Sequence, residues 1–599
     1  MNFDGNSEME LAWNMVANTD ASVFLTGKAG TGKTTFLRRI RQQINKRMVV
    51  LAPTGVAAIN AQGQTIHSFF QLALTPFLPG YVQEERKTFF RMSQEKKKLI
   101  RSLDLLVIDE ISMVRCDLLD AVDMEMRKYR DHSLPFGGVQ LLLIGDLCQL
   151  SPVAKDEEWA LLSQHYDTPY FFSSKSLQSI NYATIELHKV YRQEDQTFID
   201  LLGKIRRNAV DADVINRLNG RYIPNFQIPE NEEWIRLTTH NITAQNYNQW
   251  KLAEINTTEH TFTAEIKGNF PAFSYPTDES LTLKVGAQVM FIKNDISPAH
   301  AFYNGKIGVV CAISDEKISV WCKGETKPID VEKMAWENTK YVIDEATKDI
   351  KESVEGTFSQ FPLRLAWAIT VHKSQGLTFD HAVLDINKSF AHGQVYVALS
   401  RCRTLEGLVL SAPIDVNSVI SDSSVDSYMD NRIIEPERLR QALPSLAQAY
   451  YKKLLDEMFD FTRLTNDFNE FFKVVGRYFI GDFPEFYAML QKASPILNNE
   501  ISSVADRFRV QYSNIMASLS GDNYENDALL HERIRKAAIY FSAKLREAFH
   551  QIEFHSALTI SDKAQLKRYN NALTAFLTTY KVQLAVIEFT VLDSLSRTI

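Results

Sequence analysis

The stretch SVFLTGKAGTGKTTFLRRI, residues 22–40, says most about the architecture of this chain. It begins with an uninterrupted apolar run, which is typical of a strand buried on both faces of a parallel sheet. A glycine-rich segment of the form GxxxxGK[ST] follows, and a helix-compatible sequence comes next. In this strand–loop–helix context the glycines allow backbone amides to curl around phosphate groups. The stretch therefore predicts a phosphate-binding loop at the end of a buried strand.

The side chains of this loop suit a nucleoside triphosphate bound with Mg²⁺. Lys33 can reach the β- and γ-phosphate oxygens, and the Thr34 hydroxyl can ligate the metal ion. We therefore expect ATP and Mg²⁺ as cofactors. The predicted nucleotide-binding residues are Gly27, Gly30, Gly32, Lys33, Thr34 and Thr35.

Two later apolar runs also end in polar residues. Asp109 and Glu110 close LDLLVIDE, and Gln149 lies in GDLCQLSPV after the run VQLLLI. A strand end that faces a phosphate loop needs a carboxylate for Mg²⁺ and a base for the attacking water. We assign Asp109 to the metal, Glu110 to the base and Gln149 to sensing the γ-phosphate. In isolation, Asp109 and Glu110 would fit two solvated acids at a turn equally well.

Composition and charge limit the remaining possibilities. The chain has 599 residues, 45% hydrophobic and 23% charged, with a net charge of −7, so several folded domains are expected and any nucleic-acid surface must be local. Its five cysteines form no CxxC pair, which argues against a zinc knuckle or a disulfide framework. The acidic N-terminal segment is unlike a targeting peptide, and no apolar run reaches the ~18 residues of a membrane span. We expect a cytoplasmic protein with no membrane contact, nucleoid-associated if bacterial.

The apolar runs divide the chain into an α/β part and a helical part. Strand-like runs in the first 190 residues predict one α/β unit, and a second set beginning with ATIEL at 183 predicts another. Closely spaced strands at 287–324 predict a small antiparallel insertion, and a Ser/Asp-rich stretch predicts an exposed connector. The expected parts are 1–180, 181–412, a linker at 413–440, and an all-helical domain at 441–599.

Several longer segments occur in the order typical of superfamily 1 helicases. They are APTGVAAINAQGQTIHSFF (52–70), PFGGVQLLLIGDLCQLSPV (135–153), VYRQ (190–193), AWAITVHKSQGLTFD (366–380) and QVYVALSRCRTLEGL (394–408). The segment EISMVRCDLLDAVDMEMRKYR (110–130) also resembles a signature that one family of these helicases has between its second and third motifs. Over residues 7–412 the chain most closely resembles the Pif (petite integration frequency) family of subfamily 1B.

The resemblance implies two RecA-like P-loop NTPase domains that close on ATP and translocate 5′ to 3′ on single-stranded DNA. It implies that Arg192 and Arg401 act as arginine fingers, although each could instead form a surface ion pair. Single-stranded and tailed duplex DNA would be the partners, with roles in DNA repair, recombination and telomere maintenance. The implied DNA contacts are Pro53, Thr54, Thr65 and His67 in the first domain, and His372, Lys373, Ser374 and Gln375 in the second.

The resemblance also implies two small insertions and shows one departure. A β-barrel is expected at about 296–358 and a strand-separating wedge at about 70–92. The family places a Gln ahead of the phosphate loop to read adenine, whereas no Gln precedes Gln42 in this chain. Nucleotide selectivity is therefore left open.

The helical domain lies outside the resemblance. Residues 431–599 carry 21 basic and 20 acidic side chains, a net charge of +1, so this part shows no bulk attraction for nucleic acid. A protein partner is the favoured role for it, and the motor core is expected to be monomeric. Two alternatives to a free helicase stay open: a RecD-like subunit of a nuclease complex, and a DNA-binding remodeller whose ATPase only gates attachment.

Overall fold

The computed structural model divides into two compact units. A motor unit holds Met1–Ala17 and Ala21–Pro436, and a helical unit holds Asn18–Asp20 and Glu437–Ile599. The predicted wedge at 70–92 falls largely outside the described residues. The residues described are 5–73, 75–79, 92–191, 195–207, 209–229, 232–295, 297, 301–344, 349–386, 393–415, 422–432, 436–519, 524 and 527–592.

The first lobe of the motor unit, residues 5–191, is built on a parallel sheet with strand order β3-β2-β4-β5-β1-β6. Every residue of β1 and β5 is buried, as their continuous apolar runs predict. The strands are β1 (Ser22–Gly27), β2 (Met48–Ala52), β3 (Gln64–Thr65), β4 (Leu105–Ile108), β5 (Gln140–Ile144) and β6 (Tyr182–Leu187). The main helices are α1 (Ser7–Asn18), α2 (Lys33–Gln43), α3 (Gly55–Asn60), α4 (Ile66–Phe70), α6 (Gln94–Ser102), α7 (Cys116–Tyr129) and α8 (Asp156–Leu162).

The strand ATIEL corrects one sequence prediction. It forms most of β6, which pairs in parallel with β1 from Ser22↔Tyr182 to Gly27↔Leu187. The expectation that it opens the second α/β unit is therefore wrong. A buried parallel strand has the same apolar run in either sheet, so its sequence carries no signal for which sheet it joins.

The second lobe, residues 195–415, contains a parallel sheet with strand order β18-β7-β19-β20. This confirms a second α/β layer. The strands are β7 (Ile235–Thr238), β18 (Ala368–Thr370), β19 (Ala382–Asp385) and β20 (Leu408–Leu410). The helices are α10 (Gln196–Arg206), α11 (Ala212–Asn219), α12 (Asn241–Ala253) and α13 (Gln394–Leu399).

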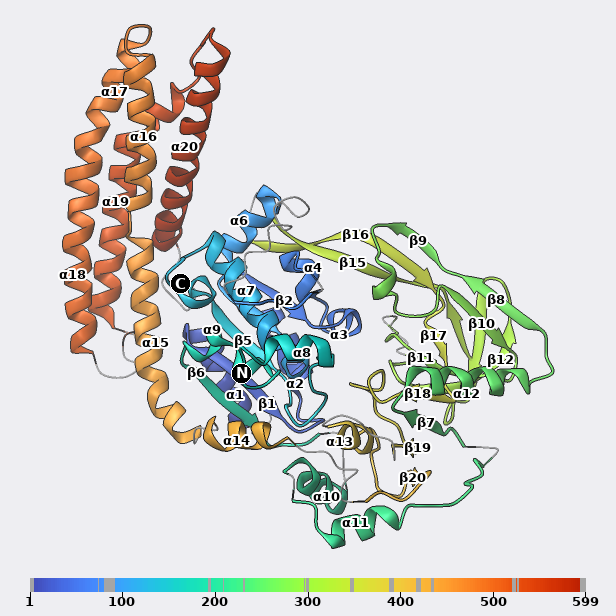
Figure 1. Ribbon diagram of the computed structural model, residues 1–599. Coiled ribbons are helices and arrows are strands. Elements are labelled where there is room, and N and C mark those ends of the chain that lie inside the picture. The colour runs from blue at the N-terminus through green and yellow to red at the C-terminus, as the bar shows by residue number, and fades with distance from the viewer. Residues whose placement is uncertain are drawn as a thin grey trace. The chain divides into compact units, whose positions relative to one another are not determined.

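An antiparallel β insertion interrupts the second lobe. Its main sheet has the order β14-β13-β12-β11-β17, which confirms the closely spaced strands expected at 287–324. Figure 1 shows the paired strands β15 and β16 extending together as a long arm. The insertion reaches beyond 296–358 on both sides. Its strands are β8 (Glu259–Thr263), β9 (Glu265–Gly268), β10 (Ser280–Lys284), β11 (Gln288–Phe291), β12 (Ile307–Ile313), β13 (Lys317–Trp321), β14 (Ile329–Glu332), β15 (Met334–Ile343), β16 (Ile350–Gln360) and β17 (Leu363–Leu365).

Part of the expected exposed connector is instead a packed helix, α14 (Ser423–Arg432). Val425 is fully buried, and the Tyr428 ring stacks on Phe172 with centroids 4.3 Å apart. The Tyr428 hydroxyl also lies 2.8 Å from that of Tyr182 on β6. The prediction was wrong here because apolar residues at helical spacing are hidden among the Ser and Asp residues of this stretch.

The second unit is all-helical, as the sequence predicts. Phe468, Phe549 and Phe576 come from three different helices, and their ring centroids lie 5.1 to 5.5 Å apart in one core. Within the ranges described above, no helix has the length and apolar character needed to cross a bilayer. The helices are α15 (Pro436–Met458), α16 (Thr462–Tyr478), α17 (Pro484–Pro495), a π-helical turn at Ile496–Ser502, α18 (Ser503–Ser518), α19 (Ala528–Phe554) and α20 (Lys563–Leu592).

Candidate functional site

A cavity of about 820 Å³ lies at the carboxyl ends of the first-lobe strands, and residues of both lobes line it. This edge of a parallel α/β sheet is where such folds bind ligands. Of the predicted site residues, the cavity wall contains Gly30, Gly32, Lys33, Thr34, Thr35, Glu110, Gln149, Gln375 and Arg401. Further lining residues include Met9, Arg39, Tyr191, Gly376, Thr378 and Arg403.

The phosphate loop has the backbone that its glycines predict. Gly30 and Gly32 adopt left-handed conformations with φ of 81° and 90°, which glycine reaches without a Cβ clash. Gly32 is the N-cap of α2, and Lys33 is its first residue. The Lys33 Nζ donates to the carbonyl oxygens of Gly27 at 2.6 Å and Lys28 at 3.0 Å. The loop therefore curls around its own lysine, next to the positive end of a helix.

Two carboxylates stand opposite the loop at the end of β4. Burial raises the pKa of Asp109 to about 6, and burial together with the Asp109 charge raises the pKa of Glu110 to about 7. Glu110 also has a left-handed backbone, with φ of 51°. The Gln375 Nε2 of the second lobe donates to Glu110 Oε2 at 2.8 Å. A carboxylate whose pKa lies near neutrality is suited to accept a proton.

A buried ion pair lies next to Gln149, which forms part of the cavity wall. Arg206 on α10 donates through Nε to Asp146 Oδ1 at 3.2 Å, and its other arm pairs with Glu186 on β6. Although burial opposes ionisation, Arg206 and Lys33 lower the pKa of Asp146 below its usual value. Gln149 Nε2 donates to the same carboxylate at 3.0 Å. Asp146 therefore orients Gln149 toward the cavity.

Neither partner of this ion pair was identified from the sequence. Asp146 stands in the same GDLCQL segment as Gln149, and the only available signal was a charged residue directly after an apolar strand. Arg206 lies on the buried side of α10, in line with Phe198 and Leu202. A cation at helical spacing on an apolar face was the signal that could have identified it.

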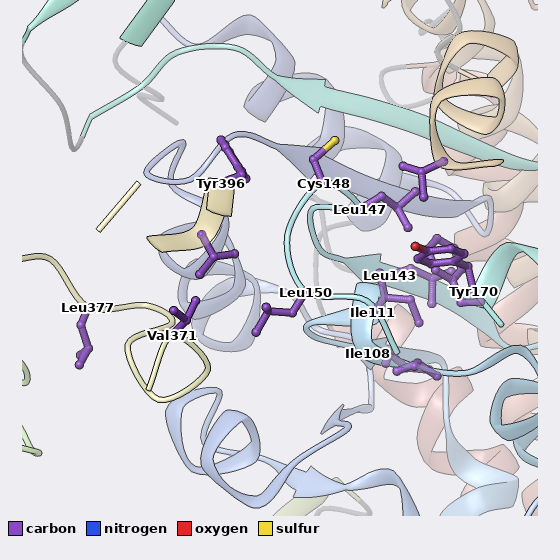
Figure 2. Close-up of a cluster of buried hydrophobic side chains, with 14 of the residues drawn as sticks. Ile108, Ile111, Leu143, Leu147, Cys148, Leu150, Tyr170, Val371, Leu377 and Tyr396 are labelled. Atoms are coloured by element: carbon purple, nitrogen blue, oxygen red, sulfur yellow. The ribbon is translucent and has the colours of Figure 1, made fainter. Parts of the chain in front are cut away.

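Helix α13 of the second lobe lies directly against the phosphate loop and Gln149. The Ala29 amide donates to the Tyr396 hydroxyl at 3.2 Å. Gly393 comes so close to the first lobe that an added Cβ would lie 1.9 Å from the Gln149 carbonyl oxygen. Figure 2 shows Tyr396 among a cluster of buried side chains, and Leu150 and Val371 join the two lobes in the same apolar core.

The two predicted arginine fingers have different outcomes. Arg192 lies outside the described residues, and the adjacent Tyr191 lines the cavity with its amide donating to Gly30 O at 2.9 Å. Arg401 lines the cavity and is 1% exposed. Its guanidinium donates to Val397 O at 2.9 Å, to Ser400 Oγ at 2.9 Å and to carbonyls of the 374–377 segment at 3.3 Å. These bonds hold Arg401 within the second lobe, at the edge of the cavity.

The segment that precedes the phosphate loop in the sequence contributes an apolar side chain to the cavity wall. Met9 of α1 contributes to the wall, and its amide donates to the Asn6 side chain at 3.0 Å. Asn6 is 2% exposed, and its Nδ2 donates to the Tyr191 hydroxyl at 3.4 Å. Met9 belongs to the segment NSEMELAW, which stands where the family pattern has a Gln, so a thioether from this segment lines the cavity.

The first-lobe DNA candidates gather beside a second cavity. Its volume is about 240 Å³, and Pro53, Thr54 and His67 are among its lining residues. Thr54 and Thr65 cap α3 and α4, because each hydroxyl accepts a backbone amide at 3.2 Å. Arg115, which pairs with Asp117 at 2.8 Å, lines the same cavity and was not singled out from the sequence. Burial, aided by Arg115, lowers the pKa of His67.

The second-lobe DNA candidates form one turn after β18. Burial lowers the pKa of His372 and of Lys373. Ser374 is fully buried and its hydroxyl donates to Val371 O at 2.7 Å, while Gln375 points into the nucleotide cavity. The structure thus brings one residue of the turn, Gln375, to the nucleotide cavity and does not expose all four side chains. Their roles as DNA contacts stay predictions.

Comparisons with known proteins agree with this geometry. A family model described as PIF1-like helicase matches residues 6–214. The ATP-dependent DNA helicase Pif1 of Bdellovibrio bacteriovorus is 34% identical over 399 residues, which cover 65% of this chain and 84% of that protein. The chain belongs to the Pif1-like helicase family. It is an ATP-dependent DNA helicase, and the predicted family resemblance is confirmed.

Solved structures extend the likeness of this Pif1-like helicase to its architecture. The crystal structure of Bacteroides sp Pif1 with ADP-AlF4 is 39% identical, has a TM-score of 0.66, and covers 71% of this chain and 96% of that one. Bacteroides Pif1 bound to ssDNA is 39% identical with a TM-score of 0.53, covering 72% and 97% respectively. A second family model, described as DNA helicase, middle domain, matches residues 442–596 and so falls on the helical unit.

The buried ion pair predicts a large effect of Arg206→Ala on stability. Removing the guanidinium would leave Asp146 buried without its cation, so the free energy of unfolding of the motor unit should fall by about 3–5 kcal/mol. Chemical denaturation of the full chain measures this change. Arg207→Ala, which removes an exposed neighbour, should cost less than about 0.5 kcal/mol. Equal effects of the two substitutions would contradict a structural role for the pair.

Proposed function

We propose that this chain hydrolyses ATP with Mg²⁺ in the cavity between its lobes and thereby moves 5′ to 3′ along single-stranded DNA, unwinding tailed duplex. The observation that carries the proposal is a single cavity that contains the phosphate loop, the Glu110 carboxylate and Arg401 from the other lobe. Opening a base-pair step costs on the order of 1.4 kcal/mol, so processive unwinding requires coupling to hydrolysis.

The first lobe supplies the nucleotide-binding residues. Gly30 and Gly32 have left-handed backbones that residues with a Cβ rarely adopt, and this loop shape fits phosphate oxygens held by backbone amides. Lys33 and Thr35 would bind the phosphates after Lys33 leaves the carbonyls it now contacts. Thr34 and Asp109 offer the hard oxygen ligands that Mg²⁺ prefers. Bound there, the metal ion would neutralise charge that develops on the phosphates.

The hydrolytic step rests on Glu110. Its raised pKa and its place in the cavity suit it to take the proton of the attacking water. We assign Gln149 to sensing the γ-phosphate, which its hydrogen bond to Asp146 and its place in the cavity wall support. We assign Arg192 and Arg401 to transition-state charge, which for Arg401 requires that it exchange carbonyl partners for phosphate oxygens.

DNA binding is linked to this chemistry through one turn of the second lobe. The turn holds His372, Lys373 and Ser374, and its next residue donates to Glu110. We propose that single-stranded DNA crosses this turn and the surface at Pro53, Thr54, Thr65 and His67. A bound DNA strand that shifts this turn would alter the hydrogen bond from Gln375 to Glu110, the proposed base. DNA binding would in this way be linked to hydrolysis.

Two insertions complete the proposed motor. The five-stranded sheet around β12 and β13 is our candidate for the small β-barrel of the family, and residues 70–92 for the strand-separating wedge. The two alternatives differ from this proposal: a RecD-like subunit would work within a nuclease complex, and a gated remodeller would use ATP only to control its attachment to DNA. A stopped-flow translocation assay on labelled single strands separates a motor from a gated binding protein.

The assignment of the base predicts that Glu110→Gln binds ATP but does not turn it over. The amide keeps the shape and the hydrogen bond to Gln375 but cannot accept a proton, so turnover should fall by about 10²-fold or more. Nucleotide binding by fluorescence and steady-state ATPase activity measure the two properties. Glu157→Gln, on the exposed side of α8, is the matched control and should leave both unchanged. Turnover within a few-fold of the parent chain would refute the assignment.

Polarity is a separate prediction. With ATP and Mg²⁺ present, a duplex with a 5′ single-stranded tail should be unwound, and the same duplex with a 3′ tail should not. Strand separation followed by fluorescence gives the rate for each substrate. Preferential unwinding of the 3′-tailed duplex would show that the direction of translocation proposed here is wrong.

A further inference from the structure

A small hollow lies in the helical unit, apart from both cavities of the motor unit. It opens between α18 and α19 and has a volume of about 330 Å³. Its floor is apolar: Phe508 and Phe541 are 7% and 1% exposed, and Val504 and Ala537 complete it. Ala537, which has a short side chain, lines the hollow beside the aromatic residues. The hollow can therefore receive an apolar side chain from another molecule.

The rim of the hollow is cationic. It carries Arg507 from α18 and Arg533 and Lys536 from α19, and helical spacing places Gln511 and Tyr540 one turn further along the same faces. Among the residues that the structure describes, Arg533 forms no ion pair, whereas Lys536 pairs with Glu532 at 2.5 Å.

The remaining contacts leave the rim positive. Arg507 donates through Nε to the Ser503 carbonyl at 3.3 Å, and no carboxylate of the described residues forms an ion pair with it. The neighbouring Asp506 pairs with Arg509 at 3.5 Å and is not part of the hollow. Glu532 is therefore the acid that directly offsets the three rim cations within the described residues, and the rim keeps an excess of positive charge.

We propose that this hollow binds an acidic peptide segment of a partner protein, with one apolar side chain of the segment on the floor and its carboxylates on Arg507, Arg533 and Lys536. Guanidinium groups match carboxylates in two parallel hydrogen bonds, which is how arginine clusters recognise acidic motifs. The apolar floor stabilises binding further by burying an apolar side chain, and a carboxylate alone does not gain this free energy. The ligand is thus a short segment that combines both kinds of side chain.

The geometry favours a peptide over single-stranded nucleic acid. Nucleic acid needs a cationic track along its backbone and free aromatic faces for its bases. Here the cations form one compact cluster, on a part of the chain, 431–599, whose net charge is +1. The Tyr540 hydroxyl donates to the Glu500 carbonyl at 3.0 Å, and its ring meets Phe541 edge-on at 5.3 Å and 78°. Tyr540 is therefore held as a wall of the hollow.

The test uses the full chain and a fluorescent peptide of several aspartates ending in phenylalanine. Fluorescence anisotropy should show saturable binding that weakens as salt is added. Arg507→Glu combined with Arg533→Glu should weaken it by at least about tenfold. Ala537→Leu, which fills the hollow without changing charge, should also weaken it. The matched control, Lys473→Glu with Lys492→Glu, makes the same charge change at exposed positions of α16 and α17 and should bind normally.

Two results would overturn the proposal. The first is that the parent chain does not bind the peptide, or that the parent chain, the rim variant and the control bind it equally well. The second is a rim variant that binds peptide normally but loses affinity for oligothymidine, which would assign the hollow to nucleic acid. ATP hydrolysis stimulated by oligothymidine should be unchanged in every variant, because none of the substituted residues belongs to the motor unit. The peptide measurement is independent of translocation, so it stands or fails separately from the proposed motor.

Discussion

The ion pair between Asp146 and Arg206 is the interaction on which the nucleotide site depends. It joins the end of β5 to α10, and through Glu186 it also reaches β6. A buried carboxylate so close to the phosphate loop is tolerated only because a guanidinium and Lys33 offset its charge. The Asp146 carboxylate then has a fixed position, and Gln149 takes its orientation from it. Gln149, which we assign to sensing the γ-phosphate, is thus oriented by a contact that involves neither ATP nor DNA.

The two lobes meet at the site through a few short contacts. Tyr396 accepts the amide of Ala29 in the phosphate loop, and Gln375 donates to Glu110. Each contact joins a second-lobe residue to a first-lobe group that we assign to nucleotide binding or hydrolysis. Since Gln375 belongs to the turn that we assign to DNA, one hydrogen bond separates the proposed DNA surface from the proposed base. The proposed coupling between the two sites therefore rests on a direct hydrogen bond.

Sequence reasoning succeeded where a residue type is tied to one backbone geometry. The phosphate loop was predictable because glycine, lysine and threonine at that spacing serve one arrangement, and the structure brings Gly30, Lys33 and Thr34 to the cavity. The buried strands were predictable from their apolar runs, but their sheet was not, as ATIEL shows. Local pattern does not encode which sheet a strand joins.

The residues that the sequence did not identify escaped prediction for a shared physical reason. Arg206 and Tyr428 act through partners that are distant in sequence, Asp146 and Phe172, so no spacing rule connects them. Gln375 was predicted as a DNA contact, yet the structure places its amide on Glu110, 265 positions away. The hollow of the helical unit was equally hidden, because the net charge of that part is near zero while its cations are concentrated at one rim.

The proposed link between DNA binding and hydrolysis depends on direct contact between the two lobes at the nucleotide cavity. Gly393→Ala tests it, because the added methyl would lie 1.9 Å from the Gln149 carbonyl oxygen and must push the lobes apart. The measurement is ATPase activity with and without oligothymidine, beside the affinity for each ligand. ATP and DNA should still bind to this variant, while the stimulation of its ATPase activity by DNA should fall by about tenfold or more. Full stimulation in Gly393→Ala would contradict it.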